Sequence, residues 1–120
     1  MTLRQSALHE AAHAVVARHY GLAVVEIVVS DRGNGHTLRE DGGPMHVQAA
    51  ITAAGEVGQR LAGEAFVDLS CDDLASFETR FGFGALWRAQ QDARQVLTTR
   101  RAAWLALAAR LERERVIVVR

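Results

Sequence analysis

The sequence has one cysteine, Cys71, and it lacks both a long apolar segment and an excess of charge of one sign. A single cysteine excludes an internal disulfide framework and fits a reducing compartment. No segment approaches the roughly 20 consecutive apolar residues that a membrane span requires, and no basic N-terminal region precedes an apolar run. We therefore expect a cytoplasmic protein that does not enter a membrane.

The charged residues also argue against one class of partner. The 14 Lys and Arg residues balance the 14 Asp and Glu residues, and no basic cluster lies early in the chain. A surface that follows a phosphate backbone needs such a cluster. The arginines near the C-terminus alternate with alanine and leucine at helical spacing, which is typical of a solvated helix face. We expect no nucleic-acid partner.

The length of 120 residues, 49% of them hydrophobic, predicts one globular domain over residues 1–120. Apolar residues at helical spacing predict helices over residues 3–20, 46–62, 70–82 and 85–115, the last with a break near residues 98–99. The small residues Ala53, Ala54, Gly55 and Gly58 allow the second of these helices to approach a neighbour closely. Helices thus account for most of the predicted fold.

A small sheet completes the prediction. The β-branched run at residues 22–30 predicts a strand, the glycines of "DRGNG" predict a turn, and residues 36–39 predict a returning strand. The final "VIVV" is an apolar tail that must pack on the body or on another subunit. The expected fold class is mainly α with a small β-sheet (α+β): an HExxH helix, a short β-hairpin and a C-terminal helical bundle.

The first predicted helix carries the strongest functional motif, His9-Glu10-Ala11-Ala12-His13. On a helix, His9 and His13 lie one turn apart and about 40° apart in rotation, so both imidazoles can bind one Zn²⁺. Glu10 lies about 100° round from His9, where it is placed to hold a water rather than to bind the metal. Zinc lowers the pKa of its water towards 7, Glu10 accepts the proton, and peptide hydrolysis follows.

The spacing leaves the third zinc ligand open among three candidates. His19 stands where the metzincin pattern H-E-x-x-H-x-x-G-x-x-H has its third histidine, but Val16 replaces the glycine that breaks that helix. In a continuous helix His19 lies about 9 Å beyond His13 and about 120° away, too far to share the metal. Glu56, or the pair Asp72 and Asp73, remain, although acidic residues after Ser70 are also typical of a helix start.

Several segments together resemble the protease domain of the FtsH-type ATP-dependent zinc metallopeptidases. The resembling segments, in chain order, are "HEAAHAVVA", "VVEIVVSDRGNGHT", "AAGEVGQRLAG", "SCDDL" and "DARQVLTTRRAAWLALAARLERE". The resemblance implies that Asp73 is the third zinc ligand. It also implies that residues 36–38 (His36, Thr37 and Leu38) form the edge strand that pairs with an extended peptide substrate.

The chain departs from that family in four ways. Ala12 replaces the glycine of the family's motif, and Gln59 stands where the family has a glutamate. The segment between "RFGFG" and the last helix is shorter than the corresponding segment of the family. No ATPase module precedes the motif, so we expect a protein that cuts flexible or unfolded polypeptides, or one that depends on a separate ATPase or delivery partner. A homo-oligomer is a further expectation.

The main hypothesis is therefore a zinc metalloendopeptidase with His9, His13 and Asp73 as zinc ligands and Glu10 as general base and acid. A second hypothesis is a catalytically silent zinc-site module that acts as a binding or regulatory protein. A third is a helical interaction protein that binds no metal. Trp87 and Trp104, at helical spacing among leucines, are expected in the core or in an interface.

Overall fold

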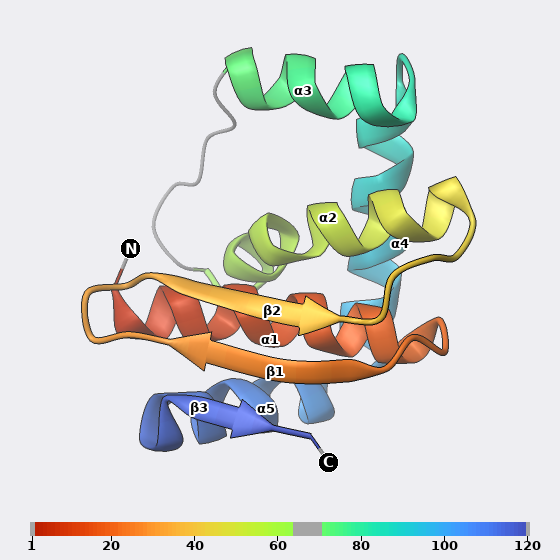
Figure 1. The fold of residues 1–120 in the computed structure, drawn as a ribbon. Helices are drawn as coiled ribbons and strands as arrows, with labels where there is room; N and C mark the ends of the chain where they lie inside the picture. The colour runs from red at the N-terminus through yellow and green to blue at the C-terminus, as the bar shows by residue number, and fades with distance from the viewer. Residues whose placement is uncertain (1, 64–70, 120) are drawn as a thin grey trace.

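The computed structural model describes residues 2–63 and 71–119, without the side chains of residues 71–74. The elements, in chain order, are α1 (Leu3–His19), β1 (Val24–Val29), β2 (Gly35–Arg39), α2 (Met45–Leu61), α3 (Cys71–Phe81), α4 (Ala85–Thr99), α5 (Arg101–Glu114) and β3 (Val116–Val118). The predicted α+β class is confirmed (Figure 1). Among the described residues, no helix combines the length and apolar character needed to cross a membrane.

Helix α1 is the central element, and its start is fixed by a capping box. The Gln5 backbone N–H donates to Thr2 Oγ1 at 3.1 Å, and the Thr2 backbone N–H donates to Gln5 Oε1 at 2.9 Å. These bonds satisfy two of the backbone donors that a helix start leaves unpaired. The helix continues without a break through Val16 and stops before Gly21, which adopts a φ of +84°.

The sheet covers one side of α1 and has the strand order β2-β1-β3, with both pairs antiparallel (Figure 1). Ile27 lies at its centre, opposite Thr37 of β2 and Ile117 of β3. Ile27 and Ile117 are buried in the core that includes α1. The apolar tail of the chain is thus a strand of this sheet, a feature that the sequence pattern did not predict. Within the described part of the chain, β2 is an edge strand.

Helix α2 lies close to α1 because the contact positions are small. A Cβ on Gly58 would lie 2.8 Å from the Ala12 Cβ and 3.1 Å from Trp104 Cζ2. Trp104 of α5 is fully buried, and its indole N–H donates to the Leu8 carbonyl at 3.0 Å. The prediction of a core position is confirmed for Trp104. Trp87 of α4 is 70% exposed and therefore lies outside the core.

The C-terminal helices complete the helical layer. The predicted break in the last helix occurs at Arg100, where α4 ends and α5 begins. Helix α4 packs on α2, whereas α5 packs on α1. Phe77 of α3 joins a smaller apolar cluster with Ala49 and Ala53 of α2 and Ala89 of α4. Helix α2 and strand β2 therefore both pack on α1, and residues of all three elements line one cleft.

Candidate metal centre

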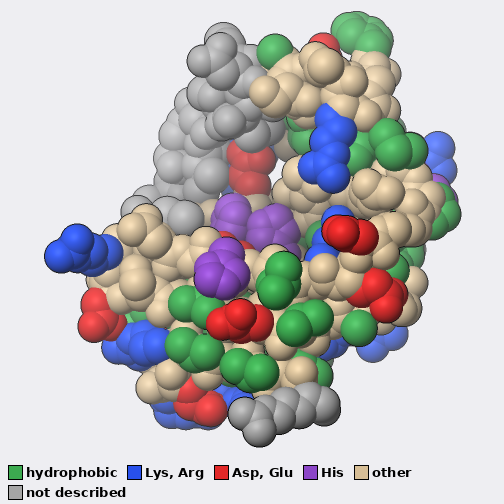
Figure 2. Space-filling model, viewed as in Figure 1, with side chains coloured by type: hydrophobic (Ala, Val, Ile, Leu, Met, Phe, Trp, Pro, Cys, Tyr) green, Lys and Arg blue, Asp and Glu red, His purple; other side chains and the backbone are tan. Residues whose placement is uncertain are grey.

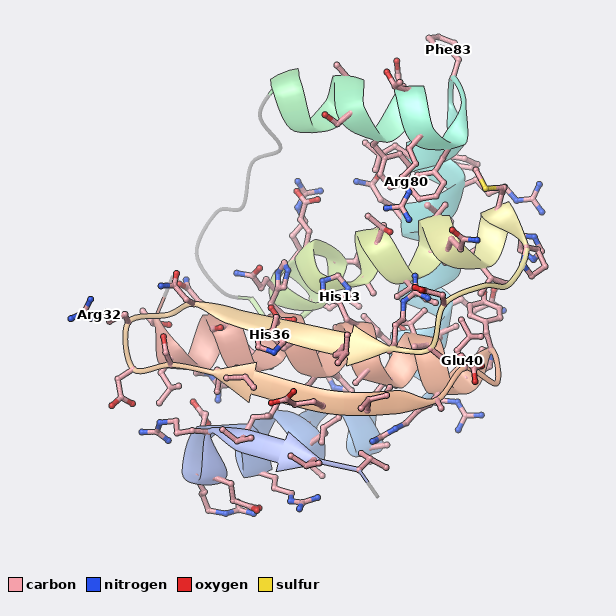
Figure 3. The ribbon with its side chains drawn as sticks, in the orientation of Figure 1. His13, Arg32, His36, Glu40, Arg80 and Phe83 are labelled. Carbon is pink, nitrogen blue, oxygen red and sulfur yellow. The ribbon has the colours of Figure 1, made fainter. Side chains whose placement is uncertain are left out.

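Histidine side chains gather in a hollow at the centre of one face of the molecule (Figure 2). The hollow corresponds to a cleft of about 260 Å³ between α1, β2 and the first half of α2. Its lining residues are Glu10, His13, Gly35, His36, Thr37, Arg39, Ile51 and Thr52. Figure 3 shows the labelled His13 and His36 side by side in this region. The cleft therefore contains the predicted general base and one of the predicted zinc ligands.

His9 and His13 lie next to each other on α1, as their spacing predicts. Their ring centroids are 4.7 Å apart, and the ring planes are inclined at 77°. The Nε2 atoms of both rings face Gly55 of α2. Two imidazole nitrogens thus converge on one small volume between the two helices.

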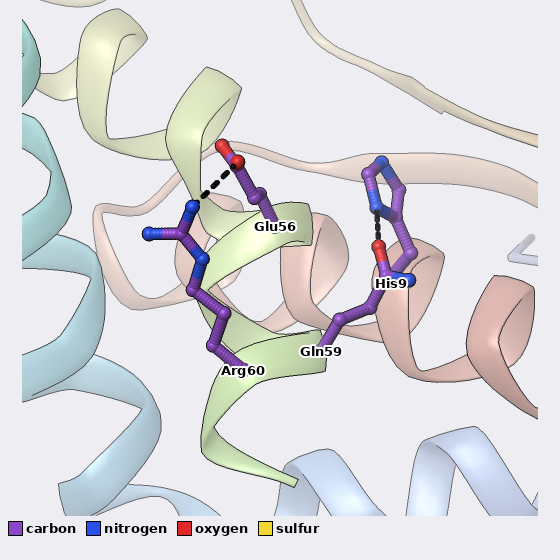
Figure 4. Close-up of polar contacts among 4 residues, drawn as sticks. All are labelled: His9, Glu56, Gln59 and Arg60. Atoms are coloured by element: carbon purple, nitrogen blue, oxygen red, sulfur yellow. Dashed lines mark hydrogen bonds and ion pairs between the residues drawn. The ribbon is translucent and has the colours of Figure 1, made fainter. Parts of the chain in front are cut away.

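The Nδ1 atom of each imidazole forms a hydrogen bond that fixes the orientation of the ring. His13 Nδ1 lies 2.6 Å from the main-chain carbonyl oxygen of Ile51. Because a carbonyl can only accept, His13 Nδ1 carries the proton and donates it. His9 Nδ1 lies 2.7 Å from Gln59 Oε1 and donates to it in the same way (Figure 4). In the neutral rings both Nε2 atoms then carry a lone pair, which is the arrangement typical of metal-binding histidines.

The environment of His13 favours the neutral form that a metal requires. Its pKa is lowered from 6.5 to about 4, first by burial and next by the neighbouring His9. The hydrogen bond to Ile51 acts in the opposite direction, and Arg39 lowers the pKa further. His13 is therefore neutral at physiological pH and needs no deprotonation before it binds a metal.

Gly55 gives the strongest indication that the two histidines fit a metal ion. A Cβ at this position would lie 2.6 Å from His13 Nε2 and closer still to His9 Nε2. Any side chain on residue 55 would therefore collide with both imidazole rings and displace them. A zinc ion held by both Nε2 atoms needs the two rings close together, since the usual Zn–N distance is about 2.0–2.1 Å.

Glu10 lines the cleft together with His13 and is buried, with 6% of its surface exposed. Its Oε1 accepts a hydrogen bond of 2.8 Å from Thr37 Oγ1 on β2. Thr37 Oγ1 also lies 3.1 Å from the main-chain oxygen of Glu10. A buried carboxylate that shares the wall of an open cleft with an imidazole is suited to proton transfer.

The predicted candidates for the third zinc ligand are found in different surroundings. His19 lies at the end of α1, where its Nδ1 accepts a hydrogen bond of 2.9 Å from Arg100 Nε. The Glu56 carboxylate forms an ion pair of 3.2 Å with Arg60 (Figure 4). Within residues 2–63 and from Ala75 onwards, no three His, Cys, Asp or Glu side chains are grouped to hold one metal. The side chains of Asp72 and Asp73 lie outside the described residues.

The three residues predicted to bind the substrate do not all lie in the cleft. His36 and Thr37 line the cleft, whereas Leu38 does not and is 51% exposed. Sequence reasoning did not identify three features of this site: the space at Gly55, the Ile51 carbonyl as partner of His13, and the contact between Thr37 and Glu10. The small residues around Gly55 indicated a close approach, but nothing in the sequence indicated what approaches.

The family comparison fits this arrangement. Residues 1–97 match the family model described as Peptidase M50B-like. No curated protein matches the chain. The match supports a zinc metallopeptidase family, but not specifically the FtsH-type family that the motifs resemble. With four fifths of its length in the match, the chain belongs to the Peptidase M50B-like family of metallopeptidases.

Proposed function

We propose that this protein is a zinc-dependent endopeptidase that hydrolyses peptide bonds in unfolded or flexible polypeptides, with Glu10 as its general base. One observation carries the proposal: the Nε2 atoms of His9 and His13 both lie within 2.6 Å of the point where a Cβ on Gly55 would be, and the buried Glu10 shares a cleft with His13. The match to a metallopeptidase family supports the same activity.

His9 and His13 would supply two nitrogen ligands to zinc. We propose Asp73 as the third ligand, because the FtsH-type resemblance assigns that position and the described residues offer no complete alternative set. When bound, zinc would polarise the peptide carbonyl and make water acidic enough to lose a proton near neutral pH. The FtsH-type character of the enzyme is part of this proposal.

Glu10 would carry out both proton transfers of the reaction. As a carboxylate it accepts a proton from the attacking water, and it then donates that proton to the amine of the departing peptide. Its position at the cleft wall gives it access to a substrate in the cleft, while its burial restrains the side chain. The hydrogen bond from Thr37 engages Oε1, and Oε2 is the oxygen that would face the water.

The substrate would bind as an added strand beside β2. This strand is at the edge of the sheet, and His36 and Thr37 place it along the cleft. An extended peptide can pair with the main-chain groups of such an edge. We propose that a separate ATPase or other delivery partner supplies unfolded substrates, and that the protein works in the cytoplasm, as a homo-oligomer.

The activity can be tested with zinc-loaded protein and an unfolded, fluorescently labelled polypeptide. We expect turnover by the wild type and a loss of at least about 100-fold in kcat for Glu10→Gln, the scale on which a positioned acid–base group contributes. Glu40→Gln is the matched control, since Glu40 is an exposed carboxylate directly after β2. Undiminished turnover by Glu10→Gln, with zinc content confirmed, would rule out the mechanism.

A catalytically silent zinc-site module is the second candidate. It is motivated by the segment between "RFGFG" and the last helix, which is shorter than in the FtsH-type family. Such a module would bind zinc with a 1:1 stoichiometry and would cleave no unfolded substrate. The same assay therefore separates the two candidates, provided that zinc content is measured in each sample.

A further inference from the structure

Thr37 and Glu10 form the most direct contact between the sheet and the candidate catalytic residues. Thr37 lies in the middle of β2, opposite the buried Ile27 of β1. Its Oγ1 is 2.8 Å from Glu10 Oε1 and 3.1 Å from the Glu10 main-chain oxygen. Both oxygens are acceptors, so the single hydroxyl proton of Thr37 is directed towards Glu10.

The neighbouring strand position supports the same contact. Gly35 lies two residues before Thr37, and therefore on the same face of β2. A Cβ on Gly35 would lie 3.0 Å from Glu10 Cγ and 2.7 Å from the Val28 carbonyl oxygen. The absence of a side chain at Gly35 leaves room for the stem of Glu10, and Thr37 binds its carboxylate.

A glutamate side chain has three rotatable bonds, and its carboxylate acts as a general base only within hydrogen-bond reach of the attacking water. The bond from Thr37 restricts this freedom through one oxygen. Because β2 is also the strand beside which the substrate would bind, the bond fixes the base relative to the substrate. A hydrogen bond between a hydroxyl and an ionised carboxylate is among the stronger types in proteins.

We propose that Thr37 is a positioning residue for Glu10, which it holds at a fixed place between the metal site and the edge strand. This inference rests on the proposed peptidase function. It assigns to the Thr37 hydroxyl a role in orienting the base, in place of the substrate contact that the sequence predicts. The substrate contact would then fall to the main chain of β2.

Steady-state kinetics of three variants test the proposal. Thr37→Val preserves the shape and removes the hydroxyl, and we expect kcat to fall by about 10- to 100-fold with KM within about twofold of the wild-type value. Thr37→Ser restores the hydroxyl and should recover most of the loss. Thr79→Val is the matched control, and we expect it to leave kcat at the wild-type value: Thr79 is an exposed residue of α3 outside the cleft lining, and its hydroxyl donates to the Ala75 main-chain oxygen at 2.8 Å.

A second readout does not depend on activity. In metal-free protein, urea unfolding of Thr37→Val, Glu10→Ala and the double variant forms a thermodynamic cycle. We expect the double variant to lose less stability than the sum of the two single variants, because each single change already breaks the shared hydrogen bond. Additive losses would show that the two side chains are not coupled and would overturn the proposal.

The outcomes also separate this inference from the proposed function. Full kcat in Thr37→Val, together with an inactive Glu10→Gln, overturns the role of Thr37 and leaves the peptidase function standing. A raised KM with unchanged kcat in Thr37→Val would assign Thr37 to substrate binding and would likewise overturn its role as a positioning residue. If the zinc-loaded wild type has no turnover, the proposed function fails and the catalytic role of Thr37 fails with it, whatever the unfolding cycle shows.

Discussion

Gly55 of α2 lies directly against His13 of α1, so that a Cβ on Gly55 would be 2.6 Å from His13 Nε2. His9 Nε2 faces the same point from the next turn of α1. The positions of the two imidazoles of the HEAAH motif therefore depend on a residue of another helix. A side chain at position 55 would displace both rings without any substitution in the motif itself.

The first prediction follows from this contact. Gly55→Ala should weaken zinc binding by at least about 10-fold, because the added methyl group would collide with both imidazole rings and push them apart. Alanine is otherwise favoured over glycine inside a helix by about 1 kcal/mol, so helix content should not fall. Competition with a chromophoric chelator gives the affinity, and circular dichroism gives the helix content. An affinity equal to that of the wild type would contradict the proposed position of the metal.

The second prediction concerns Gln59, which accepts the hydrogen bond of His9 Nδ1. Gln59→Leu keeps a similar volume and removes the acceptor, so His9 loses the partner that fixes its tautomer and orientation. The loss of such a partner typically costs about 10- to 100-fold in metal affinity. Gln59→Glu, which retains an acceptor oxygen, should bind zinc at least as tightly as the wild type. Gln48→Leu is the control, since Gln48 bonds the Gly43 carbonyl on an exposed surface.

The third prediction concerns removal of the metal. A ligand that binds only the folded state stabilises it by about 2.7 kcal/mol when its concentration is 100 times its Kd. Zinc should therefore raise the melting temperature in a concentration-dependent manner, and a chelator should reverse the effect. His13→Ala should lack this response, while His46→Ala, outside the cleft lining, should keep it. A zinc response that persists in His13→Ala would place the ion elsewhere.

The fourth prediction tests the packing that supports the site. Trp104 is fully buried between α1 and α2 and donates its indole N–H to the Leu8 carbonyl. Trp104→Ala should lower the free energy of unfolding by about 3–5 kcal/mol, as large-to-small core changes do. Trp87→Ala should change it by no more than about 0.5 kcal/mol, because Trp87 is 70% exposed. Urea unfolding measures both, and comparable losses in the two variants would be inconsistent with this core.

The sequence predicts the local features of the fold well. The helices begin and end close to the predicted positions, and the break predicted near residues 98–99 occurs at Arg100, because helix ends are set by neighbouring residues. The strand β3 was not predicted because three apolar residues have no periodicity of their own. Their structure is determined by pairing with β1, which is distant in sequence.

The candidate site shows the same division between local and distant effects. His9, Glu10 and His13 follow from spacing on one helix, and the placement of His19 away from them follows from the unbroken helix at Val16. The contacts that complete the site depend on how α2 and β2 pack against α1. A periodic pattern predicts that two elements meet but does not give the register in which they meet. The family assignment shows a similar limit, since short shared motifs indicated a zinc metallopeptidase but not the matching family.

The most direct test of the central claim is a crystal structure of the zinc-loaded protein, with the metal located by anomalous scattering at the zinc edge. We predict one zinc ion bound by His9 Nε2 and His13 Nε2 in front of Gly55, with Asp73 as the third protein ligand and Glu10 beside the ion but not bound to it. Zinc bound at another place in the molecule, with His9 and His13 free of metal, would contradict the account.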